Sequence, residues 1–179
     1  MNIKKVVVGF LEENCYIVEK NNECIIIDPG DDPNKIVNNI TLKPIAILIT
    51  HRHFDHIGAL EYISNKYNIP IYEYSNLKEG NLGIGKFNIE VIYTPGHTDD
   101  SVTYYFKDDQ IMFTGDFLFK GSIGRTDLET GNMKKMQKSI SKIKKYYDII
   151  KVYPGHNDNT TIGYEKVCNI YFKEELWKE

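Results

Sequence analysis

The sequence predicts an α/β sandwich in which sheets form the inner layers and helices form the outer layers. Segments of strand character alternate with segments of helical periodicity along all 179 residues. The strand segment at 45–49 is continuously apolar rather than alternating, which is typical of a sheet that is covered on both faces. No linker or low-complexity tract interrupts the pattern, so we expect one domain over residues 1–179.

The first half of the chain predicts a β-meander followed by a helix, a buried strand and a second helix. Strands are expected over 3–8, over 15–27 with a polar turn at 20–23, and over 45–49. Asp32 followed by Pro33 is a favourable N-cap and first-turn pair, so a short helix should extend to about residue 40. Apolar residues then recur at helical spacing and predict a helix that ends before Pro70: Ile57, Leu60, Ile63 and Tyr67.

The second half repeats this alternation. Strands are expected at about 69–73, 86–93, 102–106, 110–114 and 149–153. An apolar stripe with a lysine-rich opposite face predicts an amphipathic surface helix: Met133, Met136, Ile140, Ile143 and Tyr147. A terminal helix is expected from about 160 to 173.

Composition narrows the class of function. The chain has 22 Lys and Arg against 25 Asp and Glu, a net charge of -3, which does not favour nucleic acid or an anionic membrane as partner. No apolar run approaches the ~18 residues of a membrane-spanning helix, and the first residues lack a signal-peptide layout, so we expect a cytoplasmic protein. The three cysteines show no metal-finger spacing and predict buried thiols rather than disulfides.

The histidines carry the chemical signal. All five follow predicted strands directly: His51, His53, His56, His97 and His156. Three of them fall with Asp55 in the segment HRHFDHIG, which offers more imidazole and carboxylate donors than a structural loop needs. The cluster therefore predicts a metal site.

Spacing suggests how the donors divide. Side chains two apart in extended backbone point the same way, so His51 and His53 should face one metal, and Asp55 and His56, at a helix start, a second. The two remaining histidines would complete these sites, and Asp116, after the strand segment IMFTG, is a natural bridging carboxylate. Two metals would lower the pKa of a shared water from ~15.7 toward ~7 and provide a hydroxide nucleophile. The predicted reaction is hydrolysis.

The sequence resembles the metallo-β-lactamase superfamily, and within it the small single-domain glyoxalase II-like hydrolases. The resemblance rests on THRHFDHIG at 50–58, TPGHT at 94–98, GD at 115–116 and PGH at 154–156. It implies a four-layer αβ/βα sandwich with the metals at one sheet edge. It also implies a first metal on His51, His53 and His97, a second on Asp55, His56 and His156, and Asp116 between them.

The resemblance further implies the reaction. In enzymes of this group, a metal-bound hydroxide held through Asp55 and Asp116 attacks the thioester carbonyl of S-lactoylglutathione, and the metals polarise that carbonyl. We expect two divalent ions, with zinc first and iron or manganese also compatible, and a small thioester as the only partner. Longer glyoxalase II enzymes continue into a C-terminal helical region that this sequence lacks, so no glutathione-binding residue carries over. Oligomeric state has no signal in the sequence.

Two residues near the motifs are candidates for supporting roles. Arg125, in GSIGRTDL, could hold a substrate carboxylate or could pair with Asp127 to fix its loop. Asp28, in IIIDPG, could orient a ligand histidine or could start the turn with Pro29.

Three other functions compete with thioester hydrolysis. Persulfide dioxygenases resemble the same motifs but use one ferrous ion, whose ligands here would be His51, His97 and Asp116. A lactonase would present a similar carbonyl to the same hydroxide. A non-catalytic metal-binding module predicts eroded ligand positions, and all seven positions are intact.

Overall fold

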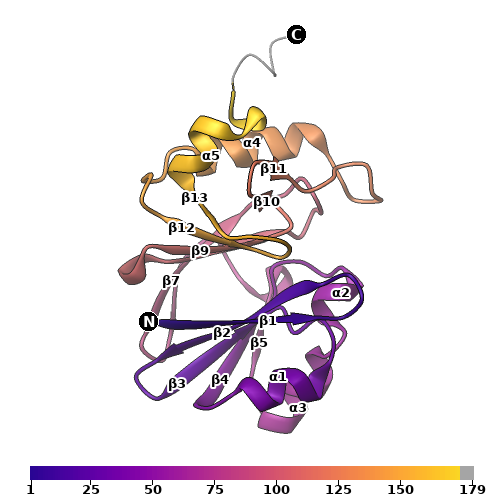
Figure 1. Cartoon of the computed structure of the whole chain (residues 1–179), viewed down its shortest axis with the longest axis vertical. Helices are drawn as coiled ribbons and strands as arrows, with labels where there is room; N and C mark the ends of the chain where they lie inside the picture. Colours follow the sequence, from indigo (N-terminus) through magenta and orange to yellow (C-terminus); the bar gives the residue numbers. More distant parts are fainter. Residues whose placement is uncertain (174–179) are drawn as a thin grey trace.

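Two sheets face each other in the computed structural model, which describes residues 1–173 (Figure 1). The first sheet has the order β1 (Asn2–Val8), β2 (Glu13–Lys20), β3 (Glu23–Ile27), β4 (Lys43–Leu48) and β5 (Ile71–Tyr72). The second has the order β13 (Thr160–Thr161), β12 (Lys151–Pro154), β9 (Ile111–Gly115), β8 (Val102–Phe106), β7 (Phe87–Tyr93) and β6 (Gly80–Ile84). A small ribbon pairs β10 (Leu118–Phe119) with β11 (Ser122–Ile123). The predicted meander is confirmed, because β1, β2 and β3 are antiparallel neighbours.

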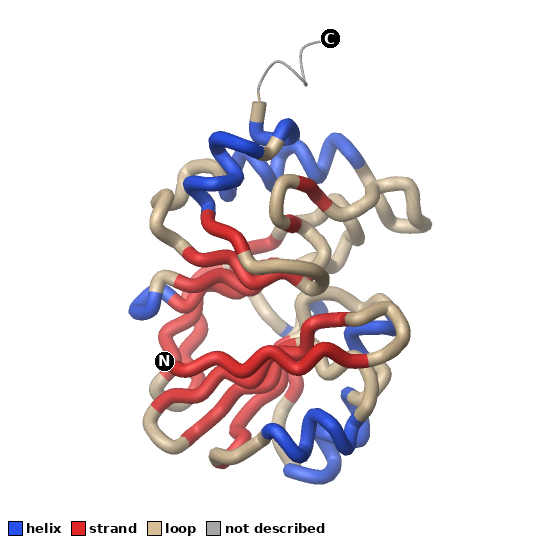
Figure 2. Tube along the Cα trace, viewed as in Figure 1, coloured by secondary structure: helices blue, strands red, loops and turns tan. Residues whose placement is uncertain are grey.

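Helices cover the outer face of each sheet (Figure 2). On the first sheet lie α1 (Pro33–Asn39) and α3 (Leu60–Tyr67), and on the second lie α4 (Met133–Ile143) and α5 (Ile162–Cys168). The short α2 (Phe54–Ile57) lies at one end of the first sheet. The predicted four-layer αβ/βα sandwich is therefore confirmed.

The continuous apolar strands are explained by burial on both faces. In β3, Ile25 and Ile27 point to the core between the sheets, whereas Cys24 and Ile26 point to the core under α1 and α3. Successive side chains of a strand lie on opposite faces, so a strand in an inner layer needs apolar residues at every position. β4 follows the same rule, with Leu48 between the sheets and Ile47 under the helices.

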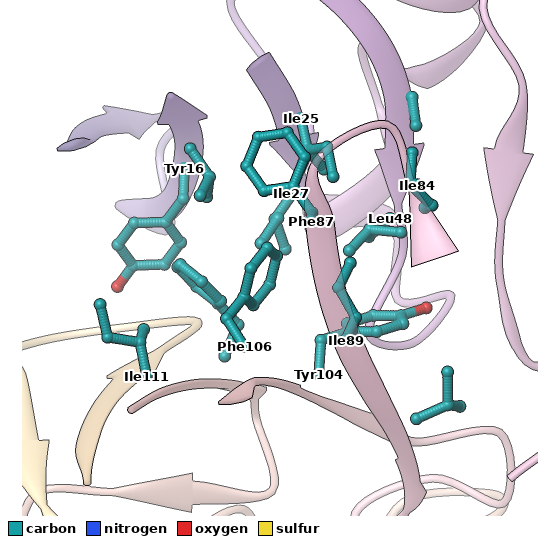
Figure 3. Packing of buried hydrophobic residues seen from close by; sticks show 14 of the residues in the cluster. Tyr16, Ile25, Ile27, Leu48, Ile84, Phe87, Ile89, Tyr104, Phe106 and Ile111 are labelled. Atoms are coloured by element: carbon teal, nitrogen blue, oxygen red, sulfur yellow. The ribbon is translucent and has the colours of Figure 1, made fainter. Parts of the chain in front are cut away.

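Aromatic and aliphatic side chains together fill the core between the sheets (Figure 3). Tyr16 from the first sheet meets Phe113 from the second with ring centroids 5.1 Å apart and planes 61° apart, which is an edge-to-face arrangement. Tyr104 is fully buried and donates its hydroxyl hydrogen to the carbonyl of Ile49 at 2.7 Å. This contact ties the second sheet to the strand end that carries the histidine motif.

Several predicted elements differ in their bounds. The helix after the histidines is two helices, α2 and α3, and β6 was not predicted. The stripe of α4 ends at Ile143, so Tyr147 lies outside the helix and is 76% exposed. Residues 160–161 form β13, and the terminal helix is only α5, followed by a 3₁₀ turn at Ile170–Phe172.

The predicted cap of α1 was wrong in its mechanism. Asp32 has φ 47° and makes no side-chain cap hydrogen bond to the helix. Its carboxylate instead accepts a hydrogen bond from the backbone N–H of Gly9 at 3.1 Å. Pro33 still occupies the first turn, where a missing N–H costs nothing. Asp32 therefore fixes the loop between β1 and β2 rather than the helix.

Two other expectations from the sequence concern membrane-spanning helices and the cysteines. No helix within residues 1–173 is both long and apolar enough to cross a membrane. Cys15 and Cys24 are buried free thiols as expected, whereas Cys168 is free and exposed.

Candidate metal centre

All five histidines converge at one end of the sandwich with two aspartates, because each follows a strand end on one of the facing sheets. The first sheet provides His51 after β4, and His53, Asp55 and His56 on and before α2. The second sheet provides His97 after β7, Asp116 after β9 and His156 after β12. Their donor atoms fall into overlapping groups within 4.8 Å: His51, His53 and His97; His51, His56 and Asp116; and Asp55, His56 and His156.

The first group consists of three imidazoles. His53 Nδ1 lies 3.1 Å from His51 Nε2 and 2.9 Å from His97 Nε2. Tetrahedral zinc with Zn–N bonds of ~2.0–2.1 Å separates its ligand atoms by about 3.3 Å. The three nitrogens are therefore spaced as ligands of one ion would be, in the combination that the family resemblance implies.

The second group mixes imidazole and carboxylate. Asp55 Oδ2 lies 3.2 Å from His156 Nε2 and 3.8 Å from His56 Nε2. Asp55 and His56 are neighbours on α2, whereas His156 comes from the far end of the chain. The Pro-Gly turn before His156 brings it against α2.

Asp116 lies between the two groups. Its Oδ1 is 3.3 Å from His56 Nε2, and its Oδ2 is 3.6 Å from His97 Nε2 and also 3.6 Å from His156 Nε2. The carboxylate therefore faces donors of both groups at once, which is the placement a bridging ligand requires.

Unpartnered buried atoms indicate that the cluster fits metal ions. His56 Nε2 and Asp116 Oδ1 are buried and have no hydrogen-bond partner, although such atoms are nearly always paired. At Gly155, an added Cβ would lie 2.3 Å from Asp116 Oδ1 and 2.6 Å from His56 Cε1. Only a glycine leaves this space between the donors free.

The backbone and neighbouring side chains fix the ring orientation of four histidines. In each of these rings Nδ1–H donates to an oxygen: His51 to Thr50 Oγ1 (3.1 Å), His56 to Asp28 Oδ2 (3.0 Å), His97 to the Arg125 carbonyl (2.8 Å) and His156 to the Leu11 carbonyl (3.1 Å). The Nε2 atoms of these rings are thereby left as free bases that face the centre. His53 is the exception, since its Nδ1 faces the other imidazoles.

The two groups differ in electrostatics. Burial and the neighbouring histidines hold the pKa of His51 well below its ordinary value. Burial also lowers the pKa of His56, but Asp116 and Asp28 outweigh this effect and raise it well above the ordinary value. In the same way Asp55 outweighs burial and raises the pKa of His156. The carboxylates beside the second group therefore favour positive charge at its imidazoles, which is the charge that a bound metal ion would supply.

Asp28 connects the motif strand to the second group. It is 2% exposed and has φ 48°, a strained value for a residue other than glycine. Its Oδ1 accepts from Thr50 N–H at 2.7 Å, and its Oδ2 accepts from Thr50 Oγ1 at 2.6 Å and from His56 Nδ1 at 3.0 Å. The structure thus places Asp28 where it can orient His56.

Arg125 contributes through its backbone. Its guanidinium is 62% exposed and bonds to Asp127 through Nε (2.7 Å) and Nη2 (2.8 Å), the loop-fixing arrangement considered from the sequence. Its carbonyl oxygen accepts from His97. A substrate-binding role of the guanidinium stays a prediction.

Glu13 is the residue that sequence reasoning missed. It is completely buried, both carboxyl oxygens lack a hydrogen-bond partner, and Oε1 lies 3.8 Å from His56 Nδ1. Burial, reinforced by nearby aspartates, raises its pKa well above the ordinary value. In the sequence Glu13 follows Glu12 in a polar segment that predicts a solvent-exposed turn. The only signal that could have indicated a buried Glu13 is its place at the start of β2, where its side chain points inward.

Asn14 and Tyr16 hold the loop that carries His156. The Tyr16 hydroxyl donates to the Pro154 carbonyl at 2.7 Å, and Asn14 Nδ2 donates to the same carbonyl and to that of Asn157, each at 3.1 Å. These contacts connect the first sheet to the second. Tyr16 therefore packs in the core and also holds the loop that carries His156.

Comparison with known proteins places the chain in a family. A family model described as the Metallo-beta-lactamase superfamily matches residues 8–87 and 78–156, and the chain belongs to this superfamily as a metallo-hydrolase with a divalent-metal site. It is 36% identical to the "Probable metallo-hydrolase YqgX" of Bacillus subtilis, over 94% of this chain and 96% of that protein. It is 30% identical to the "Hydroxyacylglutathione hydrolase GloC" of Haemophilus influenzae, over 98% and 100%.

Solved structures agree with this assignment. The B3 metallo-beta-lactamase BLEG-1 superposes with a TM-score of 0.91 and 32% identity, over 96% of this chain and 99% of that one. TTHA1623, solved in a di-iron-bound form, superposes with a TM-score of 0.88 and 31% identity, over 94% of this chain and 99% of that one. ETHE1 from Myxococcus xanthus superposes with a TM-score of 0.85 and 27% identity, over 95% of this chain and 84% of that one.

Proposed function

We propose that this protein is a binuclear metallohydrolase that cleaves a small thioester, S-lactoylglutathione or a related hydroxyacyl thiol. One observation carries the binuclear part: His56 Nε2 and Asp116 Oδ1 are buried and face each other at 3.3 Å without a hydrogen bond, beside a complete group of three imidazoles. A single ion on the three imidazoles would leave His56 Nε2, Asp55 and His156 without an ion to bind.

The proposed ligand sets follow the distances. His51, His53 and His97 would hold one ion, Asp55, His56 and His156 the other, and Asp116 would bridge. Divalent ions supply a water that is acidic near neutral pH and a Lewis acid for the carbonyl. We expect zinc on these mixed nitrogen and oxygen donors, and iron is compatible with them as well; the similar protein TTHA1623 was solved in a di-iron-bound form.

The chain's own groups position the reaction. The Nδ1–H bonds of His51, His56, His97 and His156 direct their Nε2 atoms at the space that the ions would occupy. Asp55 and Asp116 face the space between the groups, where a carboxylate oxygen can accept a hydrogen bond from the attacking water. In the reaction a C–O bond forms, the C–S bond breaks, and a water proton passes to the departing thiolate, which gives a carboxylic acid and a thiol.

The substrate assignment rests on similarity to GloC and is tested directly. Thiol release from S-D-lactoylglutathione is measured with protein reconstituted in parallel with zinc, manganese and ferrous iron, and His53→Ala serves as the blank. We expect release that is lost in the blank. Absence of release with every metal would refute the glutathione-thioester assignment.

The binuclear assignment has its own test in metal stoichiometry. His53→Ala and His156→Ala each remove one ligand of a different proposed set. We expect two equivalents of zinc in the wild type and about one in each variant after removal of weakly bound metal. A wild type that binds a single equivalent would contradict the proposal.

Persulfide dioxygenation is the second candidate function. The ligand positions support it because His51, His97 and Asp116 offer two imidazoles and one carboxylate to a ferrous ion. His97 Nε2 lies 3.6 Å from Asp116 Oδ2. Oxygen uptake with glutathione persulfide separates the two functions, since hydrolysis consumes no oxygen. Uptake by the iron-loaded protein without thioester cleavage would establish the alternative.

A further inference from the structure

A cavity of about 290 Å³ adjoins the metal centre between the loop after β1 and the helix α2. Its lining includes the apolar residues Phe10, Leu11 and Phe54, the glycine Gly58, and the acidic residues Asp31 and Asp55. We refer to these six residues as the loop pocket. Asp55 lines the pocket and also belongs to the second ligand group, so the pocket opens beside the expected reaction centre.

The aromatic wall is exposed. Phe10 is 80% exposed and Phe54 64%, and their rings stack with centroids 6.3 Å apart and planes 20° apart. Adjacent exposed aromatic side chains at the rim of a cavity are typical of a surface that binds an apolar group. Neither ring belongs to the three buried hydrophobic clusters, so the packing of the fold does not account for them.

The loop that carries Phe10 and Leu11 is fixed at both ends. Gly9 N–H bonds to Asp32 Oδ2 at 3.1 Å, and the Leu11 carbonyl accepts from His156 Nδ1 at 3.1 Å. Asn14 N–H then bonds to the Gly155 carbonyl at 2.7 Å. The pocket wall is therefore preformed and tied directly to a ligand of the second group.

Charge identifies which part of a thioester the loop pocket would accept. The charged side chains that line it, Asp31 and Asp55, are both acidic. A thiol carrier such as glutathione brings carboxylates, which Asp31 would repel, and no side chain that lines the loop pocket offers a cation or a hydrogen-bond donor to hold them. A neutral apolar acyl chain meets no such repulsion and gains from burial against the two rings.

A second cavity of about 450 Å³ adjoins His53 instead. Its lining combines the side-chain donors of Arg52, Thr98 and Thr130 with the acidic side chains of Asp99, Asp100 and Glu129. It offers donors for a polar carrier, whereas the loop pocket offers few. At about 290 Å³ the loop pocket is also at the lower limit of small-molecule sites, so it has room for part of a substrate only.

We propose that the loop pocket is the acyl subsite of this enzyme and that it selects thioesters of apolar acyl chains longer than lactoyl. The proposal rests on the thioester hydrolysis proposed above and specifies its substrate class. Phe10 and Phe54 are the specificity-determining residues, with the acyl chain lying against their rings while its carbonyl lies at the metal centre.

The test compares acyl chains on one carrier. Values of kcat/KM are measured for the S-acetyl, S-butyryl and S-hexanoyl thioesters of glutathione with wild type, Phe10→Ala and Phe54→Ala, and with Tyr147→Ala as a control far from the centre. Each methylene that enters the pocket should raise kcat/KM about fourfold, the factor that corresponds to ~0.8 kcal/mol. This increase should be largely lost in both phenylalanine variants and retained in the control.

Binding of the products gives a readout that does not depend on turnover. Hexanoate and lactate are titrated calorimetrically into the zinc-loaded protein, and we expect hexanoate to bind at least about tenfold more tightly, with Phe10→Ala removing the difference. Phe10 is exposed and can be replaced without loss of a core contact, even if Phe54→Ala disturbs α2.

The outcomes separate the two proposals. Thioester cleavage without dependence on chain length, or with the same dependence in Phe10→Ala, would refute the acyl subsite and leave the hydrolase intact. No cleavage of any thioester, together with hexanoate binding that depends on Phe10, would refute thioester hydrolysis and support the apolar subsite. No cleavage and no preference for hexanoate would refute both.

Discussion

His56 donates its Nδ1–H to Asp28 across 3.0 Å inside the protein, and the same aspartate oxygen accepts from Thr50. This carboxylate therefore determines both the tautomer of a candidate ligand and the direction of its free nitrogen. Asp28 occupies this position at a strained backbone angle of φ 48°, which the surrounding hydrogen bonds maintain.

Replacement of Asp28 by Asn should selectively weaken the second ion. The amide keeps the size of the side chain but removes the charge that aligns His56, so affinity at the second position should fall about 10- to 100-fold. Competition with a chelator, followed by metal analysis, measures the two positions separately. Asp127→Asn, at an exposed pair, is the matched control. Equal weakening of both ions would contradict an orienting role.

Replacement of Gly155 by Ala should separate metal binding from folding. The added methyl would lie 2.3 Å from Asp116 Oδ1 and 2.6 Å from His56 Cε1, within the space that the ions would occupy. Metal affinity should decrease on the order of 10- to 100-fold, whereas the far-ultraviolet circular dichroism spectrum should be unchanged. Gly83→Ala is the control, because its added Cβ would meet nothing within 4 Å. Full metal content in Gly155→Ala would argue against this location of the centre.

The buried Glu13 predicts that the free energy of unfolding of the metal-free protein depends on pH. Burial raises its pKa above the ordinary value of 4.5, so the folded state retains a proton that the unfolded chain has lost. Its contribution to stability is therefore complete below about pH 4.5 and decreases as the pH rises toward the folded pKa, by at most ~1.4 kcal/mol per pH unit. Urea unfolding at several pH values, with a chelator present to keep the protein metal-free, measures this contribution to stability.

The matched variant is Glu13→Gln, which has the same shape and no charge to desolvate. It should be more stable than the wild type near pH 7, and the difference should shrink on acidification to about pH 5. A difference that does not change with pH would show that Glu13 titrates normally in the folded state.

The sequence predicted the layers of the fold better than the ends of its elements. Each histidine follows a recognisable strand, so the seven donors could be grouped before their distances were known. Tyr147 continued the apolar period of the 133–143 helix, yet the helix ends at Ile143. The segment GNLGI, which forms β6, contains two glycines that weaken any strand signal.

Other features depend on contacts that no local pattern contains. Asp32 precedes a helix and resembles a cap, but its carboxylate bonds to Gly9 on a loop far along the chain. Glu13 and Phe54 each have ordinary sequence neighbours, and only the fold brings them beside His56 and Phe10. Spatial neighbours of this kind become visible only after the sheets have come together.

The proposed ligand sets each combine residues from both sheets. His51 and His53 would share an ion with His97, and Asp55 and His56 would share one with His156, so neither half of the chain could form the centre by itself. Binding of the ions is thus thermodynamically linked to the association of the halves, and free metal would stabilise the assembled form in proportion to the logarithm of its concentration. A measurement of metal affinity therefore gives the amount by which the ions add to the stability of the assembled halves.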